Sequence, residues 1–339
     1  LPMNLLDAIK GKRDEEDGYR RDTSAGKDAP ERKVRLDFHH ALKARAMATG
    51  RPIQLVRPDT YDPEQRKRVK RDPSRTRQLQ DEATIAWNFH TALYYKSGGT
   101  PWRLVRDPSQ LTACHVGISF YQTIDTSKLQ TSLAQIFNER GDGIIIRGGP
   151  ASISKEDRQP HLTEEAACDL LFQALESYRQ EHKTLPARAV VHKSSAYTPE
   201  ERAGFQAAID RHRVDSVDLL WVSQSHTRLF RTGAYPPLRG TLLSLDDHAH
   251  ILYTRGSVDF FSTYPGMYVP LPLRFHCESA TQTPKFLATE ILALTKMNWN
   301  NTQFDRSDPI TVRAAHQVGD VLKYASERSQ IAPRYSYYM

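Results

Sequence analysis

The sequence predicts a mixed α/β protein in two parts, and three observations support this. Over residues 1–107, helical and extended patterns alternate. From about residue 112, short apolar strand patterns come first and are followed by a strand flanked by helices. The composition, with 39% hydrophobic and 26% charged residues, is that of an ordinary globular protein. The 339 residues are enough for two domains with a large core.

The first part contains two predicted helices and one predicted strand. Residues 37–49 carry apolar side chains on one side and basic ones on the other, which predicts a helix. Residues 52–56 (PIQLV) predict a short buried strand. A strongly basic connection over residues 57–81 then leads to a helix at 82–95, which ends before Gly98 and Gly99.

The second part is predicted to hold a sheet and at least four helices. Strands are expected at residues 114–121, 142–147, 187–192 and 215–223, and two more within 240–253. Helices are expected at 163–182, 199–210 and 286–297, and another begins at Asp308-Pro309 and carries Ile310, Ala314 and His316. Strands followed by a strand between helices indicate a mixed layer of the RNase H type.

Charge, cysteines and hydropathy narrow the possible environments and partners. A formal net charge of +7 favours anionic partners without naming them. Cys114, Cys168 and Cys277 are too far apart for a metal motif and are typical of buried thiols in a reducing compartment. Because there is neither a membrane-length apolar run nor a signal-peptide pattern, a cytoplasmic protein is expected. The chain starts at Leu1 inside what looks like a strand-to-helix unit, so the natural protein is expected to extend further N-terminally.

Four polar residues of the first part form a candidate phosphate site. His39 and Lys43 are four apart and share one face of the predicted helix. Gln54 follows in PIQLV, and Lys96 lies just before Gly98-Gly99. A lysine, an imidazole and an amide together can donate several hydrogen bonds to one phosphate. Taken alone, such residues more commonly belong to a solvated helix face and to a lysine at a helix C-terminus.

Two sets of residues in this order resemble Argonaute proteins. HHALK, PIQLV, ALYYKSGG and PW resemble the pocket of the MID domain, and residues 294–316 (LTKMNWNNTQFDRSDPITVRAAH) resemble the end of the PIWI domain. The resemblance implies a Rossmann-like MID domain over 1–107, N-terminally incomplete, and an RNase H-like PIWI domain over 108–339. His39 replaces the usual aromatic residue, and Ala92 replaces a lysine of many relatives.

The resemblance also implies roles for these residues at the guide strand. His39, Lys43, Gln54 and Lys96 would bind the guide 5′-phosphate together with the chain end at Met339. The carboxylate of Met339 and the amide of Gln54 would hold a structural Mg²⁺ beside that phosphate. The aromatic ending RYSYYM is expected to be buried between the two domains, although chain ends are commonly frayed.

The PIWI nuclease site is expected to be degenerate. Two-metal hydrolysis needs carboxylates that hold two Mg²⁺ ions. The two carboxylate positions that the resemblance marks are here Ser119, in Val116-Gly117-Ile118-Ser119, and Ser194, in His192-Lys193-Ser194-Ser195. His316 matches the fourth metal position. Because a neutral hydroxyl is a poor ligand for bridged dications, we expect no catalytic activity from this chain.

Further residues are candidates for contacts with the nucleic-acid backbone. Asn298, Asn300 and Arg306 lie in the polar loop of the PIWI-like ending, and Lys193 follows a predicted strand. A basic cluster precedes residue 72 and comprises Arg66, Lys67, Arg68, Lys70 and Arg71. Such a cluster would add salt-sensitive affinity for phosphates. A solvated surface or a contact with a protein partner explains it equally well.

The length leaves no room for the other domains of long Argonautes, so the sequence looks like a short prokaryotic Argonaute. That implies a short 5′-phosphorylated guide RNA, a complementary single-stranded DNA target, and an APAZ-domain partner fused to a TIR, sirtuin-like or nuclease effector. The expected role is target sensing in prokaryotic immunity (antiphage defence), with no membrane contact. Two alternatives remain open: an active Mg²⁺-dependent guide-directed nuclease with unconventional ligands, and a structural subunit that binds protein but no guide.

Overall fold

The computed structural model defines most of the chain. It describes residues 37–71, 79–105, 109–124, 127–137, 143–230, 237–258, 260, 270–297, 299, 307–326 and 329–339, with side chains of 132–137 left aside. The candidate backbone contacts Asn298, Asn300 and Arg306 therefore lie outside the described residues.

An eight-stranded sheet runs through the second part in the order β3-β2-β1-β6-β7-β10-β9-β8. Its strands are β1 (Ala113–Gln122), β2 (Leu129–Phe137), β3 (Gly143–Ile145), β6 (Arg188–Lys193), β7 (Ser216–Gln224), β8 (Leu242–Ser244), β9 (Ala249–Leu252) and β10 (Leu273–Ser279). The central strands β1, β6 and β7 are parallel, and the other pairs are antiparallel. The predicted mixed α/β class is confirmed.

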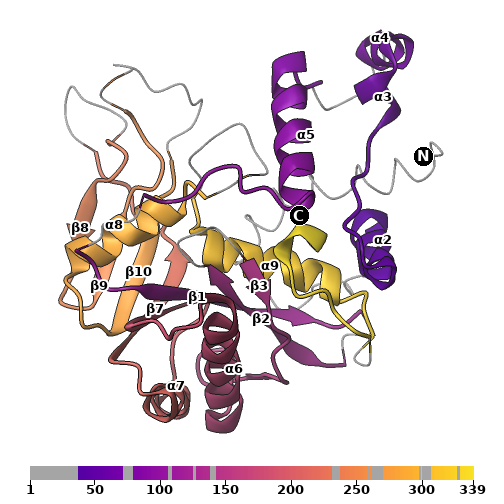
Figure 1. Ribbon diagram of the computed structural model, residues 1–339. Helices are drawn as coiled ribbons and strands as arrows, with labels where there is room; N and C mark the ends of the chain where they lie inside the picture. The colour runs from indigo at the N-terminus through magenta and orange to yellow at the C-terminus, as the bar shows by residue number, and fades with distance from the viewer. Residues whose placement is uncertain are drawn as a thin grey trace.

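Helices cover both faces of this sheet (Figure 1). The pair α6 (Glu164–His182) and α7 (Pro199–His212) packs on one face, and α8 (Pro284–Leu294) and α9 (Ile310–Leu322) pack on the other. The N-caps explain where these helices begin: Thr163 caps α6, and Thr198 forms a capping box with Glu201 at the start of α7. A short hairpin, β4 (Ser152–Ile153) with β5 (Pro160–His161), precedes α6.

All the regular secondary structure described in the first part is helical. It contains α2 (Phe38–Ala46), the 3₁₀ turn η1 (Met47–Thr49), α3 (Pro58–Tyr61), α4 (Pro63–Arg71) and α5 (Glu82–Lys96). The prediction of a strand at residues 52–56 is wrong, because the structure assigns neither helix nor strand to this segment. Within 37–71 and 79–105 there is no strand, so the expected Rossmann-like sheet is not found among these residues.

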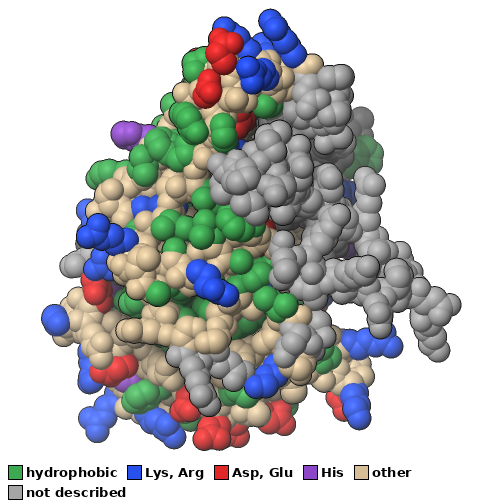
Figure 2. Space-filling view, turned by 90° about the vertical axis from the view of Figure 1, so that its right-hand side faces the viewer, with side chains coloured by type: hydrophobic (Ala, Val, Ile, Leu, Met, Phe, Trp, Pro, Cys, Tyr) green, Lys and Arg blue, Asp and Glu red, His purple; other side chains and the backbone are tan. Residues whose placement is uncertain are grey.

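The basic connection of the first part is also different from its prediction, because two short helices interrupt it. Asp62 accepts hydrogen bonds from the backbone N–H groups of Glu64 and Gln65 and so starts α4. Helix α4 lies at the top of the molecule, where Figure 2 shows lysine and arginine side chains at the surface.

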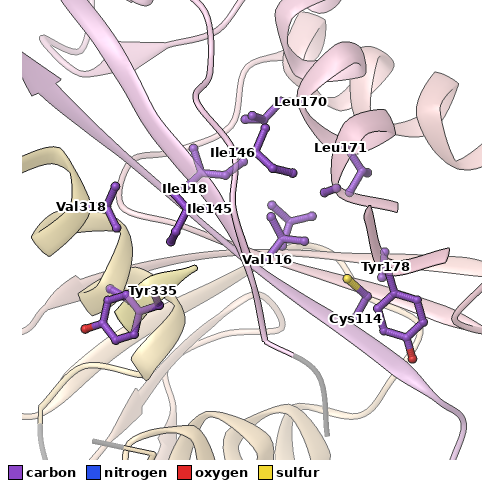
Figure 3. Close-up of a cluster of buried hydrophobic side chains, with 14 of the residues drawn as sticks. Cys114, Val116, Ile118, Ile145, Ile146, Leu170, Leu171, Tyr178, Val318 and Tyr335 are labelled. Atoms are coloured by element: carbon purple, nitrogen blue, oxygen red, sulfur yellow. The ribbon is translucent and has the colours of Figure 1, made fainter. Parts of the chain in front are cut away.

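The main core lies between the sheet and its helices (Figure 3). Cys114, Val116 and Ile118 of β1 point into it, together with Leu170 and Leu171 of α6. Val318 of α9 and Tyr335 of the C-terminal turn η3 (Tyr335–Tyr337) complete the cluster. All three cysteines are buried and free, as predicted. Among the described residues, no helix has the length and apolarity needed to cross a membrane.

Candidate nucleic-acid interface

A pocket lies where α5, the turn after η1 and the C-terminal tail come together. Its volume is about 340 Å³. Lys96 lines it, and the other lining residues are Gly50, Pro52, Pro333, Arg334, Ser336 and Tyr337. The chain end lies beside the lower end of α5 and close to α9 (Figure 1). Segments more than 200 residues apart in the sequence, from about residue 50 to residue 337, therefore share one site.

Lys96 and Gln54 are paired at this pocket. The Lys96 ammonium donates to the backbone carbonyl of Ile53 at 2.8 Å and to Oε1 of Gln54 at 2.5 Å. Burial lowers the pKa of Lys96 from its ordinary value to about 8. A partly dehydrated ammonium that is aimed into a pocket would gain from a bound anion, since the anion restores the charged form. The predicted partnership of Gln54 with Lys96 is thus present as a direct contact.

Lys43 approaches the same region from α2. Its side chain is buried, and its ammonium donates to the carbonyl of Tyr338 at 3.1 Å. Asp37 begins α2 by accepting hydrogen bonds from the N–H groups of His39 and His40. His39 is half-buried, and its ring centre lies 5.6 Å from that of His40. Lys43 therefore contacts the tail directly, while His39 lies one helical turn away on the same helix.

The C-terminal tail forms one wall of the pocket. Tyr337 donates its hydroxyl to the carbonyl of Gly50 at 2.6 Å, and Tyr338 donates to the carbonyl of Ala332 at 3.0 Å. Tyr338 and Met339 are buried. The expectation that the aromatic ending is buried against both parts of the chain is confirmed. Met339 is not among the residues that line the pocket.

The second predicted site lies at the sheet, between β1 and α9. Ser119 is fully buried in β1, and its Oγ lies 2.7 Å from Nδ1 of His316 on α9, within hydrogen-bonding distance. The pKa of His316 lies below its usual value, chiefly because surrounding protein displaces water from the ring; Asp308 and Asp320 oppose this shift. His316 itself is exposed at the surface, so the pair joins a buried hydroxyl to an accessible imidazole.

Ser194 joins this pair through the backbone. Its N–H donates to the carbonyl of Ile118 at 3.2 Å, at the point where β6 ends beside β1. Ser119 and His316 are 197 residues apart in the sequence, yet they lie in contact, and Ser194 follows the strand next to Ser119. Among the described residues, no group of three or more His, Cys, Asp or Glu side chains could hold a metal ion.

A glycine sets the distance between β1 and α9. A Cβ on Gly117 would lie 2.2 Å from the backbone carbonyl oxygen of Thr311, which is closer than any real contact. The hydroxyl of Thr311 also lies 2.8 Å from Nδ1 of His192. Burial lowers the pKa of His192 to about 3, with His115 and Arg188 contributing, so this imidazole is neutral. Gly117 thus allows the close packing that brings His316 to Ser119.

The prediction that Lys193 contacts the nucleic-acid backbone is wrong. Lys193 is fully buried, and its ammonium lies 2.6 Å from the Glu201 carboxylate. It also donates to the carbonyl of Ala196 at 2.7 Å and lies over the rings of Phe120 and Tyr197. The side chains of successive strand residues point to opposite faces, so Lys193 points away from the face that holds Ser119. Its role is to anchor the turn after β6.

A cluster of aromatic side chains that the sequence does not predict connects the two parts of the chain. Trp299 is buried, and its indole N–H donates to the carbonyl of Trp102 at 3.1 Å. Trp102 in turn donates to the carbonyl of Lys296 at 2.9 Å. The ring centres of Tyr95 and Trp299 are 4.4 Å apart. The Pro-Trp and Asn-Trp pairs were visible in the sequence, but nothing in their types indicated that they would pack together.

The chain matches no protein-family model and no curated protein sequence. Its fold, however, is similar to solved Argonaute structures. One is Clostridium butyricum Argonaute bound to a guide DNA and a 19-mer target DNA, with a TM-score of 0.64 and 16% identity over 84% of this chain and 35% of that one. Another is A. aeolicus Argonaute, with a TM-score of 0.51 and 19% identity over 73% of this chain and 33% of that one.

These matches bear on the fold of the chain, which spans about a third of the length of either Argonaute. Identities of 16% and 19% are too low to transfer an activity. Because the two matches cover 84% and 73% of this chain, they include most of the architecture described above. Together with the mixed sheet and the helices on both of its faces, the similarity shows that this chain has an Argonaute-like fold.

Proposed function

We propose that the protein binds a short guide strand by its 5′-phosphate and uses it to recognise complementary single-stranded nucleic acid, without cleaving the target itself. Sequence discrimination would come from base pairing with the guide, while the protein holds the strands through backbone and shape. By analogy with short prokaryotic Argonautes, the guide is RNA and the target is invading DNA. The solved Clostridium butyricum Argonaute, a protein of similar fold, holds a guide DNA and a target DNA.

The observation that carries this proposal is the pocket of Lys96. The ammonium of Lys96 is partly dehydrated and contacts Gln54. Lys96 lines a cavity of about 340 Å³, together with residues of the tail and of the turn at Gly50. Lys43 reaches the same tail from α2. A lysine that lines a pocket, with a second lysine on the tail beside it, suits a phosphate, which takes several charge-assisted hydrogen bonds. His39 would lie near the first base.

Absence of cleavage is proposed from the residues at the sheet edge. Ser119, Ser194 and His316 come together, but the first two supply hydroxyl groups where two-metal hydrolysis needs carboxylates. A hydroxyl cannot balance the charge of two adjacent dications. The chain would therefore act as a sensor, and any catalytic activity would belong to a partner with an APAZ domain fused to a TIR, sirtuin-like or nuclease effector. Target binding would activate that partner in antiphage defence.

A Mg²⁺ ion beside the guide phosphate fits the residues only in part. Amide and carboxylate oxygens are donors that Mg²⁺ accepts when phosphate oxygens and waters complete its shell. Oε1 of Gln54 could supply one such oxygen, although it now accepts a hydrogen bond from Lys96. The carboxylate of Met339 would be the second, on a buried residue that does not line the pocket. When bound, the ion would neutralise phosphate charge and play no part in chemistry.

The central test is to identify nucleic acid that copurifies with the protein. Short strands that carry a 5′-phosphate support the proposal, and their sugar distinguishes RNA from DNA. Loading of a synthetic strand with and without its 5′-phosphate should show a clear preference for the phosphorylated form. If no strand copurifies and neither synthetic strand binds, the protein is a structural subunit and the proposal fails.

A second experiment separates a sensor from a nuclease. The guide-loaded protein is incubated with a complementary labelled target in Mg²⁺ and in Mn²⁺, and the products are resolved by length. The proposal expects an intact target in both. Cleavage at a fixed position that disappears in His316→Ala would show that the site works with unconventional ligands and would overturn the absence of cleavage.

A further inference from the structure

Helix α4 presents an unusual arc of positive charge. Five of its nine residues are basic: Arg66, Lys67, Arg68, Lys70 and Arg71. At 100° per residue, all five project within one broad arc of the helix. Gln65 and Val69, four residues apart, occupy the remaining face, and both are half-buried. The helix therefore rests on an uncharged face and directs its cations to solvent.

The charges on this helix repel one another. Lys67 and Arg71 are four apart, as are Arg66 and Lys70, and like charges at this spacing disfavour a helix. One acid lies in the helix, Glu64, and it pairs with Lys67 at 2.8 Å. Four of the basic residues are exposed; the fifth, Arg66, is half-buried and donates to the carbonyl of Gln80 at 2.7 Å. A polyanion along the arc would turn this repulsion into attraction.

The position of α4 relative to the Lys96 pocket indicates which polyanion fits. The contact between Arg66 and Gln80 holds α4 beside the start of α5, and Lys96 is the last residue of α5 (Figure 1). The 15 residues of α5 span about 22 Å at 1.5 Å per residue. At about 3.4 Å per nucleotide along a strand, this corresponds to roughly six nucleotides.

We infer that α4 is a second nucleic-acid contact, which holds the phosphate backbone of a strand roughly six or more nucleotides from its 5′ end. The inference rests on the proposed guide binding at Lys96 and adds a separate, sequence-independent site to it. The exposed ring of Tyr61, 68% accessible at the end of α3, lies next to α4 in the chain and offers a surface on which a base could stack. An acidic protein is the competing partner for the same charges.

The test compares two quadruple variants of the whole chain. The first is K67Q/R68Q/K70Q/R71Q, in which glutamine retains a high helix propensity. The matched control, R179Q/K183Q/R211Q/K285Q, removes the same charge from exposed positions on other helices and their ends. Affinity for 5′-phosphorylated strands of 5 and 15 nucleotides is measured by fluorescence anisotropy between 50 and 300 mM salt. Thermal melting checks that both variants fold.

The expected result depends on strand length. For the 15-mer, the α4 variant should bind about tenfold more weakly at moderate salt, and its plot of log K against log salt should be shallower by up to about 0.7 for each lost contact. For the 5-mer, the variant should bind as the wild type does. The control variant should show neither change.

Three outcomes would overturn the inference. Unchanged 15-mer affinity and slope in the α4 variant would remove nucleic acid as the partner of α4 and favour an acidic protein. An equal loss for both strand lengths would show a general charge effect. If the wild-type protein bound neither strand, the proposed function itself would be wrong. That result is distinguishable from the other two because it needs no variant.

Discussion

The Lys96 pocket and the Ser119 site differ in what they require of their side chains. The pocket depends on charge: Lys96 lines it, Lys43 contacts the C-terminal tail that forms one of its walls, and burial has already lowered the pKa of Lys96 to about 8. The Ser119 site holds its positions together by a hydroxyl–imidazole contact and by close packing at Gly117, with no carboxylate among the three residues. The first site would thus respond to changes of charge, and the second to changes of side-chain size.

Reversing charge in the pocket should have the largest effect. Lys43→Glu with Lys96→Glu should weaken binding of a 5′-phosphorylated strand by at least about 100-fold, because each charge-assisted hydrogen bond contributes about 1.5–3 kcal/mol. The measurement is filter binding of a labelled strand. Lys183→Glu with Lys285→Glu, at exposed positions elsewhere, changes the net charge equally and should bind normally.

Lys43 is buried, so a milder variant guards against misfolding. Lys96→Gln alone should remove most of the preference for the 5′-phosphate while leaving the melting temperature close to that of the wild type. Retention of the full preference in Lys96→Gln would show that the pocket is not the phosphate site.

A methyl group at Gly117 should destabilise the protein more than any change of charge at the Ser119 site. Gly117→Ala places Cβ 2.2 Å from the carbonyl oxygen of Thr311, and backbone cannot move as a flexible side chain does. We expect a loss of about 3 kcal/mol in the free energy of unfolding, measured in urea. Gly149→Ala is the control, since its Cβ would meet no atom within 4 Å. Equal stability of the two variants would contradict the steric explanation.

Adding carboxylates should convert the Ser119 site into one that responds to metal. In Ser119→Asp with Ser194→Asp, two acids are forced close together, and we expect a loss of about 2 kcal/mol in metal-free buffer. Mn²⁺ should restore the melting temperature of this variant, because a dication that binds only the folded state stabilises it. The wild type should show no such response. A double variant that ignores Mn²⁺ would mean that the two strand ends are not correctly placed to share an ion.

The smallest expected effect is on the pH dependence of guide binding. Lys96 is charged below pH 8 and loses its proton above it, so binding of a phosphate dianion should weaken as pH rises from 7 to 9, by about tenfold at most. A bound phosphate favours the charged form of Lys96, so the loss of the proton shifts to higher pH. Lys96→Arg stays protonated throughout and should show a flat profile. A flat wild-type profile would place the guide phosphate away from Lys96.

Much of the second part was predictable because its patterns are local. The caps Thr163 and Thr198 and the alternation in residues 114–121 place α6, α7 and β1 within a few residues. Strand β10 was not predicted, although it has an equally clear alternation, with Leu273, Phe275 and Cys277 buried. Residues 52–56 are of strand-forming types but are not assigned as a strand, since strand formation depends on a neighbour that local sequence does not specify.

The sites show the same limit. Residue types and order suggested that Ser119 and Ser194 lie near His316, but their distances depend on how Gly117 packs against Thr311. The prediction that Lys193 lies at the surface was wrong because the residue pairs with Glu201, eight positions away, in a capping box where both charges are buried. Sequence gives the charge of a side chain, whereas its exposure depends on packing.

The contact between Gly117 and Thr311 has a consequence for how freely this protein can mutate. In a deep mutational scan scored for soluble expression, every amino-acid substitution at Gly117 should be depleted, because any Cβ collides with the backbone of Thr311. Ser194, half-buried and held through its N–H, should accept many residues. Natural variation would then change the residue at the serine position while the glycine stays fixed, so packing alone would preserve the scaffold of this site, whatever the site binds.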